Sequence, residues 1–287
     1  MKPMKIAAVT AAALGGLALA SYAAVWLLGE NLLARRYETP PLTIASAQGP
    51  EAVETGEHLA YVFGCAGCHG EDLNGRVLSE DFLYGRWSSA NLPRLAATYS
   101  DEDFARAIRH GVKKNARSVL GMPSPPLFDM RDEDLAPIIA FIRTKTDLGE
   151  KHPANTAGIL FRWDMLHGIF PPEASLIDHQ AQRRIYDLSN PIERGEYIAR
   201  NACSECHGMH FEGDPEGTGP GFAPPLTIAA AYSIDDFKHL MRTGEPLGGR
   251  DLKLMDEVAR GRFVHFTDEE VEAIHAFLVD RAMNAGQ

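Results

Sequence analysis

The first strong pattern in the chain is an apolar run from Ile6 to Leu28, 23 residues without a charge. At about 1.5 Å per residue in a helix, such a run exceeds the roughly 30 Å of a bilayer's hydrocarbon core. Lys2 and Lys5 precede the run, and Trp26 near its far end is of a type that favours the membrane interface. The pattern predicts one transmembrane helix, with the basic N-terminus inside and everything after Glu30 exported.

A cleavable export signal is the alternative interpretation of this segment. Ala18-Leu19-Ala20 has the small-x-small form of a cleavage site, but the apolar run continues past it. Export signals have apolar regions of about 7–15 residues, so this run is long for one. We therefore predict a retained anchor at residues 1–30 and a linker at residues 31–50.

The strongest organisational feature is a repeat of residues 56–143 in residues 195–281. Both copies open with Gly-Glu and a short apolar stretch. Further on, both contain Tyr-Ser-x-x-Asp-Phe followed by Arg-x-Gly. A constant separation of 133 positions links Phe104 to Phe237. The repeat predicts two domains of one fold.

Both copies have the periodicity of short helices. Apolar residues recur at helical spacing in the last segment of each copy, residues 132–143 and 268–281. Arg131 precedes the first of these segments where the second copy has a capping residue, so that helix needs another cap. Three hydroxyl residues stand three positions before an acidic one, which is the pattern of a helix N-cap: Ser100, Ser233 and Thr267.

Loops rich in Gly and Pro separate these helices, and no stretch alternates like a strand for long. We predict an all-α fold with two tandem domains, residues 51–147 and 191–287, after one N-terminal transmembrane helix. Residues 148–190 are predicted to be a connector that wraps the two domains. Short helices with long loops make a thin core, so each domain needs apolar bulk from another source.

All four cysteines belong to two copies of Cys-x-x-Cys-His, the pattern of c-type haem attachment. Two cysteines three apart on a helical turn reach the two vinyl groups, and the next histidine then lies under the iron. The pattern predicts two covalently bound haem c groups, which would also supply the missing apolar bulk. The residues concerned are Cys65, Cys68 and His69 in the first copy and Cys203, Cys206 and His207 in the second.

A zinc site or a redox dithiol is the alternative for these cysteines. Zinc-binding pairs usually lie closer in sequence than the 135 positions that separate Cys68 from Cys203. A redox dithiol of the thioredoxin type needs a βαβ surrounding, which the pattern does not predict. Haem attachment is therefore the favoured interpretation.

The sixth iron ligand is the functional question, because an open position binds gases or peroxide whereas a filled one favours electron transfer. Met122 and Met255 are 133 positions apart, the separation that runs through the repeat, and each is placed in a loop before the last helix. We predict that Met122 and Met255 are the sixth ligands, opposite His69 and His207. Met130 is the alternative in the first domain, where a core position suits it better. The histidines that flank the motifs have no counterparts in the other copy.

Charge limits the class of partner. The chain of 287 residues has a formal net charge of −11, which disfavours nucleic acid because phosphate binding needs a basic face. Residues 51–147 carry a net charge of −4 and residues 191–287 carry −8. We hypothesise that the second domain meets a basic partner, such as a soluble cytochrome, and the first a different redox protein nearer the membrane. The alternative is that both acidic faces are simply solvated.

These residues resemble class I cytochrome c domains in tandem, as in membrane-anchored diheme cytochromes c. The resemblance rests on Cys-Ala-Gly-Cys-His-Gly with Gly121-Met122-Pro123, and on Cys-Ser-Glu-Cys-His-Gly with the segment from Met255 to Phe263. It covers about residues 50–285. The resemblance implies an all-α fold, His/Met-ligated iron and a periplasmic location.

The expected function is electron transfer between a periplasmic or membrane redox enzyme and a downstream carrier or terminal oxidase. Expected protein partners are dehydrogenase or oxidase subunits and soluble cytochrome c. We also expect the N-terminal helix to cross a bacterial inner membrane once. We expect no substrate chemistry in the chain itself; the alternative is a diheme enzyme of the peroxidase or thiosulfate-oxidising type. An insertion in the first copy near Tyr84-Gly-Arg-Trp87 is either a docking loop or, as the better interpretation, a tolerated surface insertion.

Overall fold

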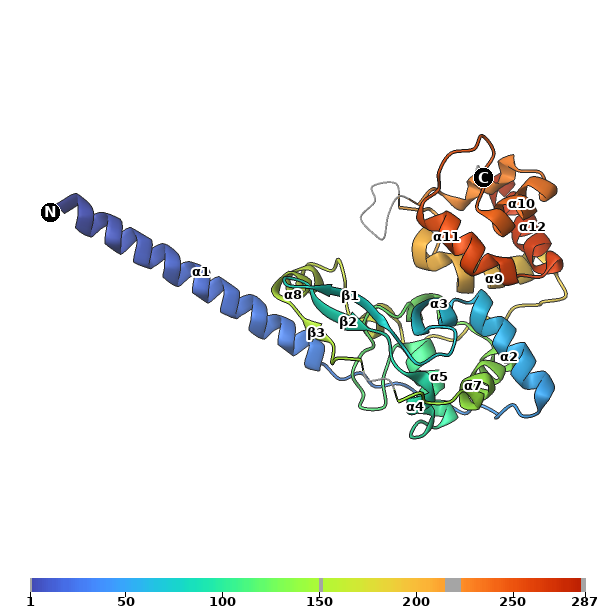
Figure 1. The fold of residues 1–287 in the computed structure, drawn as a ribbon, viewed down its shortest axis with the longest axis horizontal. Helices are drawn as coiled ribbons and strands as arrows, with labels where there is room; N and C mark the ends of the chain where they lie inside the picture. The colour runs from blue at the N-terminus through green and yellow to red at the C-terminus, as the bar shows by residue number, and fades with distance from the viewer. Residues whose placement is uncertain (1, 150–151, 215–222, 285–287) are drawn as a thin grey trace.

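The computed structural model describes residues 2–149, 152–214 and 223–284. Helix α1 (Lys2–Ala34) stands away from the rest as one long rod, and the remaining helices form two neighbouring groups (Figure 1). The segment Lys5–Ala34 is long and apolar enough to cross a membrane. The expected apolar helix is therefore present, and it continues past Leu28 to Ala34.

The first group of helices contains the first copy of the repeat. Its helices are α2 (Pro50–Val62), α3 (Cys65–His69), α4 (Leu92–Ala96), α5 (Asp101–His110), α6 (Ser124–Leu127) and α7 (Asp132–Thr144). The main packing contact is between α2 and α7. The two helices approach so closely that a Cβ on Gly56 would lie 1.9 Å from the carbonyl oxygen of Pro137.

The second group repeats this packing. It contains α9 (Pro191–His207), the 3₁₀ helix η2 (Leu226–Ala231), α10 (Ile234–Thr243), α11 (Leu254–Gly261), the 3₁₀ helix η3 (Phe263–His265) and α12 (Asp268–Asn284). Helix α9 packs on α12, and a Cβ on Gly195 would lie 1.9 Å from the carbonyl oxygen of Ala273. The Gly-Glu pairs of the repeat therefore mark one helix crossing in each domain. The all-α prediction is confirmed.

A small sheet adds to this helical fold. Strands β1 (Val77–Asp81) and β2 (Gly85–Ser88) form an antiparallel hairpin, and β3 (Thr156–Ala157) from the connector pairs with β2. The hairpin is the insertion of the first copy. Every residue of β1 is exposed, so no alternation of apolar and polar residues could reveal it.

The connector continues from β3 through α8 (Ile159–Leu166) and the 3₁₀ helix η1 (Glu173–Leu176). Near its end, Arg183 donates a hydrogen bond to the carbonyl oxygen of Met130 in the first domain. The next residue, Arg184, pairs with Glu196 on α9. The connector thus contacts both helical groups, while the exact domain boundaries stay predictions.

The helix caps expected from sequence are present. Ser100 and Ser233 accept hydrogen bonds from the backbone N–H groups three residues on, and Thr267 with Glu270 forms a complete capping box. Helix α7 has no cap from Arg131. Instead the Tyr197 hydroxyl, which comes from α9, accepts a bond of 3.2 Å from the Arg131 N–H and donates one of 2.5 Å to Asp134. One domain therefore caps a helix of the other.

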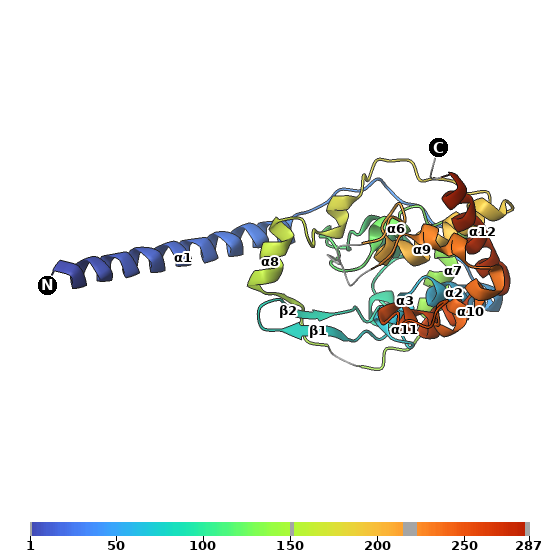
Figure 2. The same ribbon diagram turned by 90° about the horizontal axis from the view of Figure 1, so that it is seen from above.

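The two helical groups share one apolar core, so the connector is not the only contact between them. Phe63 of the first domain meets Tyr197 of the second with ring centroids 6.2 Å apart. His58 on α2 pairs with Glu270 on α12 at 2.9 Å. In two views turned by 90°, α2 and α3 lie beside the second group (Figures 1 and 2).

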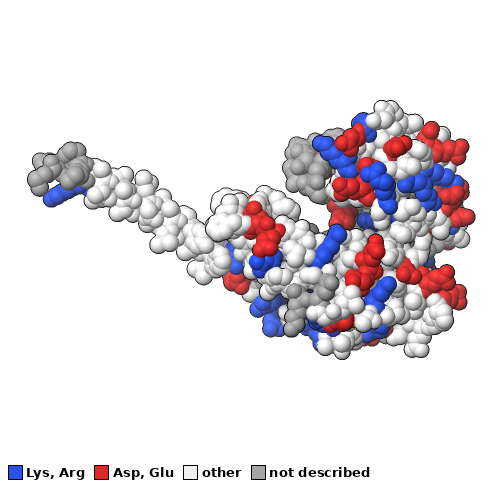
Figure 3. All heavy atoms as spheres, in the orientation of Figure 1, with Lys and Arg blue, Asp and Glu red and all other residues white. Residues whose placement is uncertain are grey.

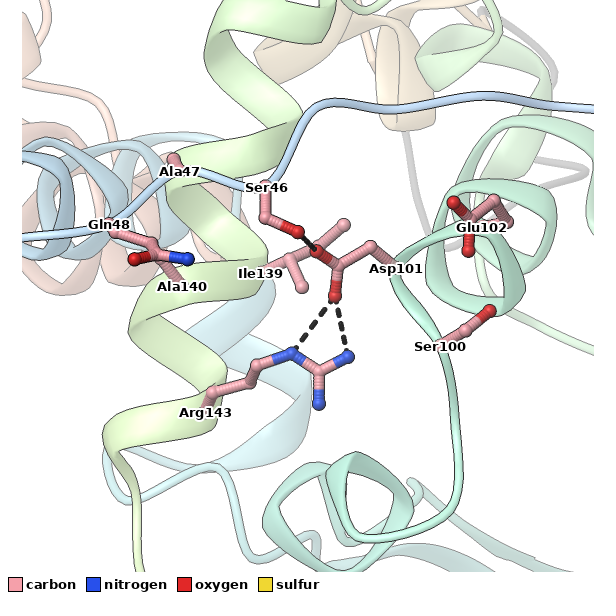
Figure 4. A pocket seen from close by; sticks show the side chains of 9 residues that line it. All are labelled: Ser46, Ala47, Gln48, Ser100, Asp101, Glu102, Ile139, Ala140 and Arg143. Carbon is pink, nitrogen blue, oxygen red and sulfur yellow. Dashed lines mark hydrogen bonds and ion pairs between the residues drawn. The ribbon is translucent and has the colours of Figure 1, made fainter.

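The linker between α1 and α2 lies across the first domain. Ser46 donates a hydrogen bond to Asp101 at the start of α5, and Arg143 on α7 donates to the same carboxylate at 2.9 Å (Figure 4). Although partial burial alone would raise it, these hydrogen bonds lower the pKa of Asp101. The pocket beside this contact is lined by residues 46–48 of the linker together with residues of α5 and α7, and it contains none of the Cys-x-x-Cys-His residues.

Candidate haem-binding sites

The first Cys-x-x-Cys-His forms one isolated helical turn, α3. Gly64 and Gly70 border it with φ angles of 84° and 82°, in the left-handed half of the map that glycine adopts without strain. The second copy instead forms the end of the continuous helix α9, which stops at Gly208. In both copies the cysteines are separated by one helical turn and partly buried, as attachment to one haem requires.

Both motif histidines have the same hydrogen bond. The Nδ1 atom of His69 lies 2.8 Å from the carbonyl oxygen of Ala90, and that of His207 lies 2.8 Å from the carbonyl oxygen of Pro224. A carbonyl oxygen can only accept, so Nδ1 carries the proton and Nε2 keeps its lone pair. Each ring is therefore fixed in the tautomer that an iron ligand needs.

The chain after each histidine makes the same turn. The carbonyl oxygen of His69 accepts from the N–H of Gly75 at 2.8 Å, and that of His207 accepts from Gly213 at 2.9 Å. Leu73 and Phe211, both four residues after the histidine, are buried with φ angles of 59° and 57°. Two non-glycine residues at one repeat position in this uncommon conformation indicate one loop design. Their carbonyl oxygens accept from the N–H groups of Leu92 and Leu226, two residues after the Ala90 and Pro224 carbonyls that the histidines bind.

The surroundings of the motif histidines and cysteines favour the uncharged forms of these side chains. Burial lowers the pKa of His69 and of His207 against the opposing effect of the carbonyl bonds, which favours the neutral imidazole that binds metal. Burial also raises the pKa of the Cys65 thiol to about 11 and that of Cys203 to about 12. A thioether has no proton to lose, so covalent haem attachment suits these apolar positions.

The structure places the methionines in different elements. Met122 lies in the loop before α6, and Met255 lies at the start of α11, not in a loop as expected; both are partly buried against the core. The turn that places Met255 has Lys253 at a φ of 51°, a conformation that sequence patterns rarely reveal. Met130 is 1% exposed inside the core, in keeping with its structural interpretation. Ligation by Met122 and Met255 stays a prediction.

One side chain that the sequence did not point to lies between the two motifs. Arg262, which follows α11, donates from Nε to the carbonyl oxygen of Val62 at 2.9 Å. Its Nη1 lies 3.9 Å from the carboxylate of Glu205, inside the second motif, and a Cβ on Gly64 would lie 2.7 Å from its Cζ. Burial raises the pKa of all four cysteine thiols, and the positive charge of Arg262 opposes that rise at each. The two attachment segments therefore face each other across this guanidinium.

Comparison with known families decides the class of protein. Residues 192–281 match the family described as Cytochrome c, and residues 51–142 match the family described as Cytochrome C oxidase, cbb3-type, subunit III. The chain is a cytochrome c. Its two matched segments coincide with the two copies of the repeat, so this cytochrome carries two cytochrome c domains.

Two curated relatives resemble this cytochrome over most of its length. The gluconate 2-dehydrogenase cytochrome c subunit of Pantoea cypripedii is 24% identical over 275 residues, covering 82% of this chain and 61% of the relative. The cytochrome c subunit of alcohol dehydrogenase (quinone) from Gluconobacter oxydans (strain 621H) is 24% identical over 278 residues, covering 82% and 57%. This cytochrome thus spans about three fifths of the length of these relatives.

Cytochrome c domains imply covalently bound haem c, and the residues of this cytochrome fit that group. In each domain the two cysteines would hold the porphyrin and the histidine Nε2 would bind the iron. A bound haem supplies a one-electron redox centre. The protein itself fixes the imidazole orientation through the Ala90 and Pro224 carbonyls and brings a positive charge, Arg262, between the two attachment segments.

Proposed function

We propose that this cytochrome is the electron-transferring subunit of a membrane dehydrogenase complex. It receives electrons from the dehydrogenase and passes them to a downstream carrier or terminal oxidase, without acting on the substrate itself. The observation that carries the proposal is the pair of motif histidines, each held by the same carbonyl hydrogen bond. Two relatives named as cytochrome c subunits of dehydrogenases support the assignment.

Two haem c groups with His/Met-ligated iron belong to this proposal. His69 and Met122 bind the first iron, and His207 and Met255 bind the second. Methionine ligation fills the sixth position and raises the reduction potential, which suits transfer of electrons rather than binding of peroxide. The partly buried positions of Met122 and Met255 against the core support this ligand set.

The proposed location is a bacterial inner membrane, crossed once by α1, with both cytochrome domains in the periplasm. The length and apolar surface of Lys5–Ala34 support this placement. So does the order of the segments, because Lys2 and Lys5 precede the apolar run and positive residues favour the cytoplasmic side.

A single-turnover experiment on the detergent-solubilised full-length protein tests the function. Haem content is measured after acid–acetone extraction, and the reduced protein is then mixed either with ferric soluble cytochrome c or with hydrogen peroxide. We expect two haems to stay on each chain, rapid oxidation by cytochrome c and only slow oxidation by peroxide. Catalytic consumption of peroxide would contradict the proposal and favour the diheme enzyme.

A further inference from the structure

The hairpin insertion and α8 form one unit at the far end of α1. The Arg162 side chain on α8 is buried, and its guanidinium lies 4.1 Å from the centroid of the Trp26 ring. Arg162 also pairs with Glu30 at 2.7 Å, and a Cβ on Gly29 would lie 2.8 Å from its Cβ. An ion pair and a cation–π contact thus fix α8 to the last turns of α1.

The hairpin is in turn fixed to α8. The N–H of Leu160 donates to the carbonyl oxygen of Leu83 at 3.1 Å, and the Tyr84 hydroxyl donates to Asp164 at 2.9 Å. The Trp87 ring on β2 also packs against the Phe161 ring on α8, with their centroids 4.3 Å apart. The tip of the hairpin therefore has a defined position beside α8.

This unit exposes large apolar side chains. The Phe82 side chain at the hairpin tip is 97% exposed, Trp163 on α8 is 49% exposed, and Ile169 just after α8 is 53% exposed. Leu83 and Phe170 beside them are exposed as well. We call these five residues the aromatic surface. In the space-filling view the unit beside the end of α1 is largely white, whereas the helical domains carry many red and blue atoms (Figure 3).

Three described carboxylates near the aromatic surface have partners. Glu80 pairs with Arg86, and Asp81 accepts from the N–H groups of Leu83 and Tyr84 at 2.7 and 2.8 Å. Asp164 accepts from Tyr84. Contact of the aromatic surface with an apolar medium would therefore leave these charges in their existing pairs.

The depth of the unit follows from its contacts with α1. The apolar run ends at Leu28, and Arg162 contacts Trp26 on one side of that point and Gly29 on the other. At about 1.5 Å per residue, these positions lie within a few ångströms of the end of the apolar run. Helix α8 and the side chains it exposes are therefore at the level where a bilayer crossed by α1 has its interface.

We propose that the aromatic surface lies in the interfacial layer of the same bilayer that α1 crosses, a proposal that rests on the anchoring role of α1. Lipid is favoured over a protein partner because Arg162 fixes α8 to α1 at the end of the apolar run, which is at interfacial depth. Tryptophan and aliphatic residues also partition well into that layer. The first cytochrome domain would then have two membrane contacts, which fixes its orientation as a single helix could not.

Spin labels at single introduced cysteines test this contact in the full-length haem-loaded protein in phosphatidylcholine–phosphatidylglycerol nanodiscs. The natural cysteines are blocked as thioethers, so each label site is unique. Phe82→Cys and Ile169→Cys report on the aromatic surface. Leu17→Cys reports on the middle of α1, and Ile185→Cys, 91% exposed in the connector beside α9, is the aqueous control.

The readout is the ratio of label collisions with oxygen, which concentrates in lipid, to collisions with a water-soluble nickel complex. We expect a ratio several-fold higher at Phe82 and Ile169 than at Ile185. Equal ratios at these three sites, with Leu17 lipid-exposed, would overturn the lipid contact and leave the anchor intact. An aqueous ratio at Leu17 would overturn the anchor itself. If labels at Phe82 and Ile169 were shielded from the nickel complex in native membranes but not in nanodiscs, the surface would contact a protein partner and not lipid.

Discussion

At the scale of single residues, the two haem-binding sites depend on the side chains of the Cys-x-x-Cys-His motifs and on backbone carbonyl groups from other segments. The cysteines and histidines form a sequence motif, so they were predictable from spacing alone. The carbonyl oxygens of Ala90 and Pro224 were not, because a backbone carbonyl is common to every residue and only the fold selects which one faces the imidazole. Two pairs of residues at equal positions after the histidines, buried Leu73 and Phe211 and the glycines Gly75 and Gly213, are sequence signals that could have located the turns next to them.

The proposed methionine ligands can be tested one at a time. Met122→Ala and Met255→Ala should each open one iron, because alanine offers no donor atom. We expect loss of half of the near-infrared band of Met–iron ligation, carbon monoxide binding at one haem and a lower potential of that haem. Met130→Leu is the matched control and should leave the spectrum unchanged, since Met130 is enclosed by the core. A spectral change in the control instead of in Met122→Ala would transfer the role to Met130.

The pair of His58 and Glu270 makes domain packing sensitive to pH. The hydrogen bond and charge of Glu270 raise the pKa of His58, although partial burial opposes the rise. The stabilisation is fully present below the ordinary histidine pKa of about 6.5, and it is lost as pH rises through the higher folded-state value. We expect the unfolding temperature of the native protein to fall over that window relative to His58→Gln. Glu270→Gln, which keeps the α12 cap, should show the same loss of pH dependence, and a pH profile identical in all three proteins would contradict this role.

At the scale of elements, the repeat predicted most helices and their caps, because local periodicity and capping residues lie close together in sequence. It could not predict the cap of α7, whose hydroxyl donor comes from a residue 63 positions after Asp134. Nor could it predict the hairpin, whose strands are held by hydrogen bonds to each other and to the connector rather than by a buried face. Contacts that join distant segments leave no periodic pattern in the chain.

Removing the Tyr197 hydroxyl tests the cap supplied across the interface. Tyr197→Phe leaves the partly buried Asp134 carboxylate without this donor and the Arg131 N–H without its acceptor. We expect a loss of about 1–3 kcal/mol in the free energy of unfolding, measured by denaturant titration of the haem-loaded protein. Tyr186→Phe is the control, because among the described residues the buried Tyr186 hydroxyl has no hydrogen-bond partner. Equal stabilities of the two variants would show that the bond adds nothing.

At the scale of the whole molecule, Arg262 links the two haem-attachment segments. The sequence did not single it out, because no local pattern shows that this side chain contacts Val62, 200 positions earlier. A positive charge favours addition of an electron to a nearby centre. Replacing Arg262 by Met, which keeps an apolar stem, should therefore lower both reduction potentials in a spectroelectrochemical titration.

A nearby arginine provides the control for charge alone. Arg260→Met removes the same charge from the surface of α11, where Arg260 is exposed and paired with Asp256. We expect smaller shifts in potential for Arg260→Met than for Arg262→Met, since water screens an exposed charge. Unchanged potentials in Arg262→Met would show that this side chain serves packing only.

The contact of Arg262 with Val62 also orders events in time. The two residues are 200 positions apart, and the chain is synthesised from its N-terminal end. Cys65 and Cys68 therefore emerge while the segment that will cover them is still being synthesised or translocated. Haem attachment to the first motif can therefore begin before the second domain covers it, whereas the second motif, at the end of α9, is completed after the first domain has been synthesised. Maturation of this cytochrome should then proceed in one direction along the chain, and the interface closes only after the first cofactor is in place.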